Sequence, residues 1–482
     1  MSPGAQARRR RVGLLAGLVI PAVLLFLPPP AGLPPAGWRT AAIAVLMATW
    51  WISEAIPIPA TALAPLVLFP LLGIAPIGPV AAPYANPVIF LFLGGFLIAA
   101  GLEACGLHRR IALVILNAVG PRPARVVGGF MVAVAFVSMW VSNTATVAMF
   151  LPLAVSVADL VDRSAGPGPE AANFGTALML GTAYAASLGG IGTLIGTPPN
   201  ALLAGFMEES YGRPIGFGQW MLVGVPLVLV SLPIAWFLLV RLFFPIHFPE
   251  VPGGRALLRE ELAGLGKPTR EEAIVGAIGL MAAAAWVARP ALERVIPGLS
   301  DPGIALAAGL ALFMVPSARR RGGRTLDWER MRGLPWGVLL LFGGGLALAD
   351  AIQGSGLAGW MGVGLEAARA LPPIVVVLLV TTLLVFLTEL TSNTAITAAF
   401  LPVAGALALA IGVDPIFLAA PAAIGGSCAF MLPVATPPNA MVYATGRIAM
   451  GQMMRSGFWL NLVMIVLVTA VASVAAAVLR SP

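Results

Sequence analysis

The chain alternates between long apolar segments and short polar ones. Segments such as Met221–Val240 and Trp459–Leu479 are long enough to cross a hydrocarbon core of roughly 30 Å as helices. About eleven such spans are expected, together with two apolar segments that polar residues interrupt. This pattern predicts an all-α integral membrane protein.

Each interrupted segment carries the same polar triad, Ser-Asn-Thr. The first reads "VSNTATVAMFLP" at 141–152 and the second "TSNTAITAAFLP" at 391–402. Irregular backbone at membrane depth is tolerated only where protein or a water-filled cavity satisfies its polar groups. We therefore expect two re-entrant helical hairpins, at about 125–152 and 371–402, with the triads at their tips. Because Ser, Asn and Thr are preferred N-caps, the second arms should begin near Ala145 and Ala395.

A second motif, Thr-Pro-Pro-Asn, is also present twice. It occurs in "IGTPPNALL" at 195–203 and in "VATPPNAMV" at 434–442. Thr is a suitable N-cap and Pro a suitable first helical residue, while Pro ends any helix that arrives before it. The motif thus predicts one broken span in each half of the chain. A single triad is commonly a helix-packing feature and a single Pro pair a kink, but the two repeated pairs favour a functional site.

The repeated motifs keep one order along the chain, which indicates an internal duplication. "FLFLGGFLIAAGLEACGL" at 90–107 also corresponds to "LLLFGGGLALADAIQGSGL" at 339–357. We assign residues 1–245 to a first repeat, 246–272 to a hydrophilic cytoplasmic linker and 273–482 to a second repeat. Six spans before the linker and five after it would insert the halves with opposite orientation. Such an inverted repeat is the architecture of many secondary transporters.

The predicted breaks suggest a site for ions at the centre of the protein. Helix N-termini attract anions, whereas freed carbonyls and hydroxyls suit a hard cation such as Na+. Neither triad and neither Thr-Pro-Pro-Asn motif contains Lys or Arg. These features predict that cation binding completes a site for a multiply charged anion.

Composition and charge place the chain in the membrane. Of its 482 residues 59% are hydrophobic and 10% charged, with a mean hydropathy of +0.96, whereas soluble proteins carry about 25% charged residues. The net charge of +8 comes from basic loops rather than from a nucleic-acid-binding surface. By the positive-inside rule these loops and the N-terminus are cytoplasmic, and an odd number of spans puts the C-terminus outside. The basic clusters are Arg8–Arg11, Arg109 and Arg110 with Arg122 and Arg125, Arg255–Arg270, and Arg319–Arg332.

Other reactive residues do not form an enzyme-like constellation. The two histidines and two cysteines are scattered along the chain, which argues against a nucleophile–base pair or a metal site for catalysis. Glu389, three residues before Ser392, has Met139 as its counterpart in the first repeat. A carboxylate inside a membrane segment is a candidate proton carrier, but its apolar counterpart favours a structural role.

The paired SNT and TPPN motifs, together with "WWISEAIPIPATALAPL" at 50–66 and "FLFLGGFL" at 90–97, resemble the divalent anion/sodium symporter family. These are the INDY-type di- and tricarboxylate transporters. The resemblance extends from about Trp38 to Arg455. It implies eleven transmembrane helices, two re-entrant hairpins and an elevator mechanism, in a homodimer of the cytoplasmic (inner) membrane.

The resemblance also implies individual site residues. The first sodium site would use Ser138, Ser142, Asn143 and the carbonyl of Gly196, and the second Thr388, Thr391, Asn393 and the carbonyl of Ala435. The substrate would meet Asn143, Thr144, Thr197, Pro198, Asn393, Thr394, Thr436 and Pro437. Four-residue spacing further predicts that Ser138 and Ser142, like Thr388 and Ser392, lie one helical turn apart.

The expected function is therefore sodium-coupled symport of C4-type dicarboxylates such as succinate, malate or fumarate. A sodium-independent dicarboxylate exchanger, a sodium-coupled sulfate transporter and an anion channel are the alternatives.

Overall fold

The computed structural model describes residues 3–165, 168–251, 253–318 and 322–479. Within these ranges the chain forms helices and no β-strand; one isolated bridge joins Pro316 and Arg324. The prediction of an all-α protein is confirmed. Of the predicted basic clusters, Arg319, Arg320 and Arg321 lie outside the described residues.

The N-terminal third forms a first group of helices, in which α1 packs on α2 while the long α6 packs mainly on α15 (Asp301–Leu312), outside the group. α6 begins after Asn86, whose side chain accepts a hydrogen bond from the N–H of Val88 (2.9 Å), and it ends at Gly106 in the left-handed region (φ 81°). The group comprises α1 (Pro3–Phe26), α2 (Pro35–Ser53), α3 (Ile58–Thr61), α4 (Ala64–Leu71), α5 (Ile77–Ala81), the 3-10 turn Ala82–Ala85, α6 (Pro87–Cys105) and α7 (Leu107–Val119).

Two sets of five helices follow the same order of elements. Each set begins with a helix–turn–helix pair. A helix that ends ahead of the Thr-Pro-Pro-Asn motif (the stopped helix) follows, then a non-helical gap, a helix that begins at that motif, and a long closing helix. The first set is α8 (Pro123–Ser138), α9 (Asn143–Ala165), α10 (Pro169–Gly190), α11 (Pro198–Tyr211) and α12 (Phe217–Phe237), which continues as the π-helical turn Leu238–Phe243. The second set is α19 (Pro373–Thr388), α20 (Asn393–Ala410), α21 (Ile416–Gly426), α22 (Pro437–Tyr443) and α23 (Met450–Val478).

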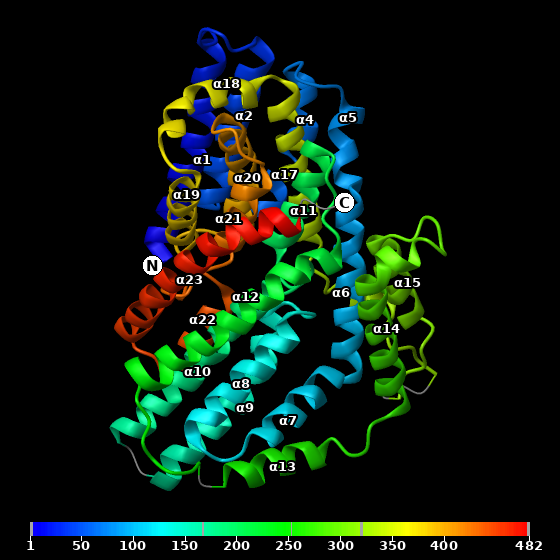
Figure 1. Ribbon diagram of the computed structural model, residues 1–482, viewed down its shortest axis with the longest axis vertical. Helices are drawn as coiled ribbons and strands as arrows, with labels where there is room; N and C mark the ends of the chain where they lie inside the picture. The colour runs from blue at the N-terminus through cyan, green and yellow to red at the C-terminus, as the bar shows by residue number, and fades with distance from the viewer. Residues whose placement is uncertain (1–2, 166–167, 252, 319–321, 480–482) are drawn as a thin grey trace.

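The two sets cross over one another. Within each set the stopped helix packs on its own hairpin: α10 on α8 and α9, and α21 on α19 and α20. Between the sets, α9 packs on α22, α20 on α11, and α12 on α23. α10 is apolar and almost completely buried from Phe174 to Gly190, as expected for a helix surrounded by protein. Figure 1 shows α8, α9, α10 and α12 running side by side.

The remaining helices separate the two sets along the chain. α14 and α15 pack with α6 at one edge of the molecule, on the right of Figure 1. The linker 246–272, expected only to be hydrophilic, contains the helix α13, in which Leu258 is buried while Arg255 and Arg259 are exposed. These elements are α13 (Gly254–Gly264), α14 (Arg270–Leu292), α15 (Asp301–Leu312), α16 (Trp328–Met331), α17 (Trp336–Gly354), α18 (Leu357–Gly364) and the 3-10 turn Glu366–Ala370.

Seven helical stretches among the described residues are long and apolar enough to cross a membrane. They are Ile77–Cys105, Asn143–Arg163, Phe217–Phe243, Arg270–Leu292, Trp336–Gly354, Asn393–Ala410 and Met450–Val478. Shorter apolar helices, among them α8, α19 and α21, accompany them. The chain is therefore a multi-pass membrane protein, and the count of eleven spans stays a prediction.

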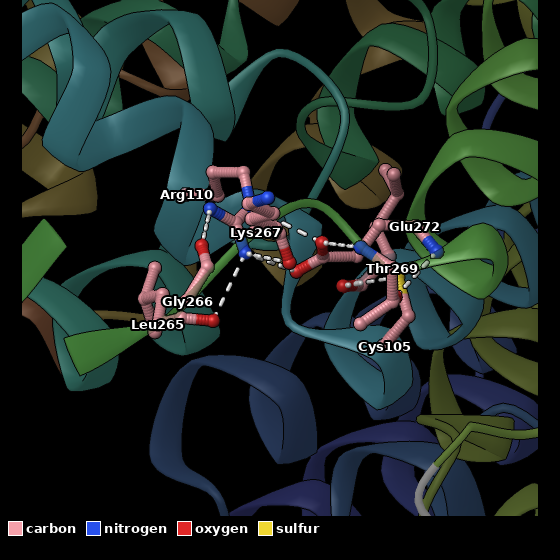
Figure 2. A network of polar contacts seen from close by, with 8 residues as sticks. Cys105, Arg110, Leu265, Gly266, Lys267, Thr269 and Glu272 are labelled. Atoms are coloured by element: carbon pink, nitrogen blue, oxygen red, sulfur yellow. Dashed lines mark hydrogen bonds and ion pairs between the residues drawn. The ribbon is translucent and has the colours of Figure 1, made fainter. Parts of the chain in front are cut away.

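A buried ion pair fixes the linker to α7. The guanidinium of Arg110 donates from Nε to Glu272 Oε2 (3.1 Å) and from its two other nitrogens to the carbonyls of Gly266 (2.9 Å) and Leu265 (3.2 Å). Glu272 also accepts from the N–H of Thr269 (2.8 Å), which caps α14. The side chains of Arg110 and Glu272 are 11% and 6% exposed. Figure 2 shows these contacts converging on one guanidinium, which joins α7, the linker and α14.

This network predicts unequal effects for neighbouring arginines. Arg110→Met should lower the free energy of unfolding by about 3 kcal/mol, because Glu272 would stay buried without its cation. The matched control is Arg109→Met. Arg109 pairs with Glu261 at 2.6 Å, but the two side chains are 53% and 36% exposed, so the change should cost less than about 1 kcal/mol. Thermal unfolding of both variants in detergent measures the difference, and equal losses would contradict the anchoring role of Arg110.

Candidate functional site

Both triads lie at the turn of a helix–turn–helix pair, as predicted. α8 ends at Ser138 and α9 begins at Asn143; α19 ends at Thr388 and α20 begins at Asn393. The residue before each second arm, Ser142 or Ser392, lies at the N-cap position. The Oγ of Ser142 accepts from the N–H of Ala145 (3.3 Å), whereas Ser392 makes no such bond.

Three details of the predicted hairpins were wrong. The second arms begin at Asn143 and Asn393, two residues before Ala145 and Ala395. They also run past the predicted ends at 152 and 402, to Ala165 and Ala410, because helix-compatible residues follow the prolines. Ser138 and Ser142 do not lie on one helix, nor do Thr388 and Ser392, since a turn separates the members of each pair.

One hydroxyl in each set ties the hairpin tip to the helix that stops short. The Oγ of Ser138 lies within donating distance of Asn143 Oδ1 (2.6 Å) and the Ala186 carbonyl (2.8 Å). The Oγ1 of Thr388 does the same with Asn393 Oδ1 (2.7 Å) and the Gly426 carbonyl (3.0 Å). Ser138 and Thr388 are completely buried. The two sets thus place a hydroxyl, an amide oxygen and a carbonyl together in the same way.

The second motif breaks the helix in each set as predicted. α10 ends at Gly190 and α11 begins at Pro198, with Thr197 at the N-cap. The N–H of Asn200 donates to the Thr197 carbonyl (3.2 Å) and not to that of Gly196. α22 begins at Pro437, and the N–H of Asn439 donates to Thr436 Oγ1 (3.2 Å) instead of to the Ala435 carbonyl. In both sets the carbonyl before the N-cap threonine is thereby left available to a ligand.

The asparagine of each Thr-Pro-Pro-Asn motif braces the gap between the helices. Asn200 Nδ2 donates to the carbonyls of Gly190 (3.2 Å) and Thr193 (2.8 Å). Asn439 Nδ2 donates to those of Ala429 (3.1 Å) and Leu432 (3.1 Å), at the same spacings along the chain. Both asparagines are completely buried. They were not among the predicted site residues, although the repetition of Asn in both motifs was a usable signal.

The oxygens of the first set converge beside Gly190. A Cβ on Gly190 would lie 2.7 Å from Asn143 Oδ1 and 3.1 Å from the Gly196 carbonyl oxygen. Two neutral oxygens therefore lie against the position that a Cβ would take, and a third, Ser138 Oγ, is bonded to the Asn143 amide oxygen. Hydroxyl, amide and carbonyl oxygens are the ligands that hard cations prefer. The donor set therefore fits Na+, and Gly190 is a site residue that the sequence reasoning missed.

The other predicted residues lie around this centre with different exposures. Thr144 and Thr394 occupy the first turns of α9 and α20, the former exposed and the latter half-buried. Thr197 and Thr436 are buried N-caps, with Pro198 half-buried and Pro437 exposed beside them. Two predicted sodium ligands show no contact to the rest of the set. Ser142 is exposed and caps α9, and Thr391 Oγ1 donates to the Leu387 carbonyl (3.1 Å).

An exposed face of α9 leads away from the first tip. Thr144, Ala148, Pro152 and Ser156 are exposed at four-residue spacing, which places them on one side of the helix. The last three line a cavity of about 330 Å³ that also contacts Arg109 of α7 and Glu261 of α13. This stripe joins the triad to the end of the molecule that carries the linker.

Comparison with known proteins decides the family. Residues 8–481 match the sodium:sulfate symporter transmembrane region. The chain belongs to the sodium:sulfate symporter family. The sodium-dependent dicarboxylate transporters SdcS of Staphylococcus saprophyticus and Staphylococcus aureus are each 42% identical to it, over 467 and 468 residues, covering 95% of this chain and 90% of the relative. The resemblance to the divalent anion/sodium symporters is thus confirmed, and this family member is a transporter and not an enzyme.

Two transporters of known structure share the fold of this symporter-family chain. The YdaH transporter of Alcanivorax borkumensis aligns with a TM-score of 0.59 and 17% identity, over 91% of this chain and 98% of its own. MtrF of Neisseria gonorrhoeae aligns with a TM-score of 0.54 and 13% identity, over 97% and 94%. At such identities the likeness concerns the fold alone.

The crowding at Gly190 gives a specific prediction for this family member. Gly190→Ala should abolish transport, because the added methyl would displace Asn143 Oδ1 and the Gly196 carbonyl. Gly279→Ala is the matched control: Gly279 lies in α14 with no atom within 4 Å of the added Cβ, and Ala favours a helix by about 1 kcal/mol. Uptake of labelled succinate, a dicarboxylate, by equal amounts of folded protein in vesicles measures both. Normal uptake by Gly190→Ala would exclude an ion site at this position.

Proposed function

We propose that the protein is a sodium-coupled symporter of C4-type dicarboxylates such as succinate, malate and fumarate. The observation that carries the proposal is the repeated set of neutral oxygens: a buried hydroxyl bonded to an asparagine amide at each hairpin tip. The names of the relatives, which describe sodium-dependent dicarboxylate transport, support the same conclusion.

Each repeated set would hold one sodium ion. The first site would comprise Ser138, Asn143 and the Gly196 carbonyl, with Ser142 as the outermost ligand. The second would comprise Thr388, Asn393 and the Ala435 carbonyl, with Thr391 beside them. The hydroxyls that now donate to Asn143 and Asn393 keep lone pairs that can face a cation. None of these ligands carries a charge, so each ion would bring a full positive charge to the centre.

The dianion would lie between the two sodium sites. Its carboxylates would meet Asn143 and Asn393 and the first turns of α9 and α20, where Thr144 and Thr394 lie, together with Thr197, Pro198, Thr436 and Pro437. Free N–H groups and the positive end of the helix dipole stabilise an anion at such positions. The adjacent sodium ions would offset the remaining negative charge. Coupling follows, because each ion raises the affinity for the other and the effect is reciprocal.

We further propose an inverted-repeat elevator in the cytoplasmic membrane. The repeats would be residues 1–245 and 273–482, joined by the cytoplasmic linker 246–272, with eleven spans, two re-entrant hairpins and an external C-terminus. The two crossed helix sets would move as one unit against α6, α14 and α15, which would belong to the scaffold of a homodimer. The exposed stripe of α9, which ends at a cavity beside Arg109, would be the route to the cytoplasm.

Sodium dependence is the first test. Purified protein in proteoliposomes should accumulate labelled succinate with an inward sodium gradient, and uptake should saturate and be competed by malate and fumarate. Replacement of sodium by choline should reduce uptake to the level of empty vesicles. Uptake unchanged in choline would refute sodium coupling, and uptake only into vesicles preloaded with succinate would establish an exchanger. Strong competition by sulfate would favour a sulfate carrier, and flux without ion coupling a channel.

The paired asparagines test the site. Asn143→Ala and Asn393→Ala should each reduce succinate uptake to background, because each removes an amide oxygen from one sodium site and a donor from the dianion. Asn173→Ala is the control; its amide donates to the Pro245 carbonyl (3.1 Å), away from the triads. Uptake should then remain near that of the unmodified protein. Activity retained by both triad variants would rule out the assigned site.

A further inference from the structure

Glu389 is a buried carboxylate at the tip of the second hairpin, directly after Thr388. It is 3% exposed. Its oxygens accept hydrogen bonds from the backbone N–H groups of Phe430 (2.7 Å), Met431 (2.9 Å) and Leu432 (3.0 Å), and from Asn461 Nδ2 (2.8 Å). Three consecutive backbone donors therefore point at one side chain.

These donors belong to the gap between α21 and α22, and through them Glu389 sets the position of a proposed sodium ligand. The carbonyl of Leu432 accepts from the N–H of Ala435 (3.2 Å) and from the amide of Asn439 (3.1 Å). Leu432 is thus held through its N–H by Glu389 and through its carbonyl by the residues that follow. The Ala435 carbonyl is connected to the hairpin tip by this route.

The first set makes the same connection without a charge. Met139, the counterpart of Glu389, accepts through its backbone carbonyl a hydrogen bond from Thr193 Oγ1 (2.5 Å). The same hydroxyl accepts from the N–H of Gly196 (3.1 Å). Met139 is therefore connected to Gly196 in the first set, as Glu389 is to Ala435 in the second. Both connections fix the residue whose carbonyl lies before the N-cap threonine. Only the second set uses an ionisable side chain for it.

The closing helices α23 and α12 also differ in this way: one contacts an ionisable side chain and the other an uncharged group. In the second set α23 supplies Asn461 to Glu389, and one turn earlier Gly457 lets the Phe430 carbonyl approach to 2.2 Å from where a Cβ would lie. In the first set α12 supplies Trp220, whose Nε1 donates to the Ile191 carbonyl (2.9 Å). The closing helix of the second set thus reaches its gap through an acid that accepts from the N–H groups, whereas that of the first set donates directly to a carbonyl of its gap.

The contacts of Glu389 suit its ionised form. All four of its partners are donors, and a carboxylate is an acceptor. None of the ion pairs formed by the described residues includes Glu389. A buried charge without a counter-ion is unfavourable. A sodium ion at the proposed second site, whose ligand Thr388 directly precedes Glu389 in the chain, would supply that counter-ion, whereas Met139 gives the first site no equivalent charge.

We infer that Glu389 is a positioning residue that makes the two sodium sites unequal. Building on the proposed function, it holds the Ala435 carbonyl in place and gives the second site a fixed negative charge. The second site accordingly binds sodium more tightly and fills first. The first site fills afterwards, together with the dianion, since the uncharged Met139 stands at the position that corresponds to Glu389.

The charge of Glu389 is tested by the sodium dependence of succinate uptake. Glu389→Gln should raise the sodium concentration for half-maximal uptake by about fivefold or more, because an attraction in a low-dielectric site is lost. The KM for succinate at saturating sodium should change less than about twofold. Asn461→Leu is the control, because it keeps the charge of Glu389 and its three backbone donors. A second comparison variant, Thr193→Val, removes the uncharged link between Met139 and Gly196 in the first set. An unchanged sodium dependence in folded Glu389→Gln, or an equal rise in Asn461→Leu, would overturn the inference.

A second measurement leaves Glu389 intact, in case its variant does not fold. Thermal unfolding of purified Asn143→Ala and Asn393→Ala is followed as sodium replaces choline, without succinate. Sodium should still stabilise Asn143→Ala, whose second site is complete, and should stabilise Asn393→Ala much less. Equal responses, or the reverse order, would refute unequal sites. Because sodium-dependent uptake by the unmodified protein tests the proposed function separately, failure of the inference alone would leave that uptake intact.

Discussion

The structure depends on one constraint: a helix interrupted inside the protein leaves backbone groups that no other turn of that helix can satisfy. At both interruptions, side chains at corresponding positions of the two sets satisfy these backbone groups. Asn200 and Asn439 bind the carbonyls that each gap exposes, and Ser138 and Thr388 join the stopped helices to the hairpin tips. The carbonyl before each N-cap threonine is not used in this bracing, and in the first set it lies with the Asn143 amide oxygen beside Gly190. The ligand set is thus what is left when the breaks have been stabilised.

A centre built from neutral oxygens makes its ions dependent on one another. In a low-dielectric interior a lone dianion would be strongly unfavourable, as would two sodium ions without it. In the proposed function, binding all of them together would reduce the net charge, so no arginine or lysine would be needed within the triads to attract the dianion. A permanent cation there would hold the anion in the absence of sodium and weaken the coupling. The lack of basic residues in these motifs is therefore consistent with symport, in which the empty and the fully loaded forms are the ones that move.

The sequence allowed the helical class, the hairpin tips and the helix breaks to be predicted, because local chemistry determines them: N-cap residues, proline and repetition. It did not allow the contacts between distant segments to be predicted. Glu389 binds residues 41 to 72 positions away, and no local pattern indicates such a partner. Gly190 matters only because two oxygens pack against it. The arms were predicted too short: the predicted hairpins end at Pro152 and Pro402, and both prolines lie within helices that continue. α13 was missed because the charged residues between its leucines indicated only a hydrophilic linker.

The crossed packing of the two sets has a consequence for biosynthesis. α9 packs on α22, and α20 packs on α11, so each half of the chain completes the packing of the other half's hairpin. While the protein is being made, α9 lacks this partner until α22 (Pro437–Tyr443), one of the last elements, has been synthesised, whereas Ser138 and Asn143 already have contacts within their own set. Assembly of the centre is then a late step that joins two separately inserted halves. A chain that stops before α22 would leave the face of α9 that α22 covers exposed to lipid or to the insertion machinery, which gives cellular quality control a mark of incomplete synthesis.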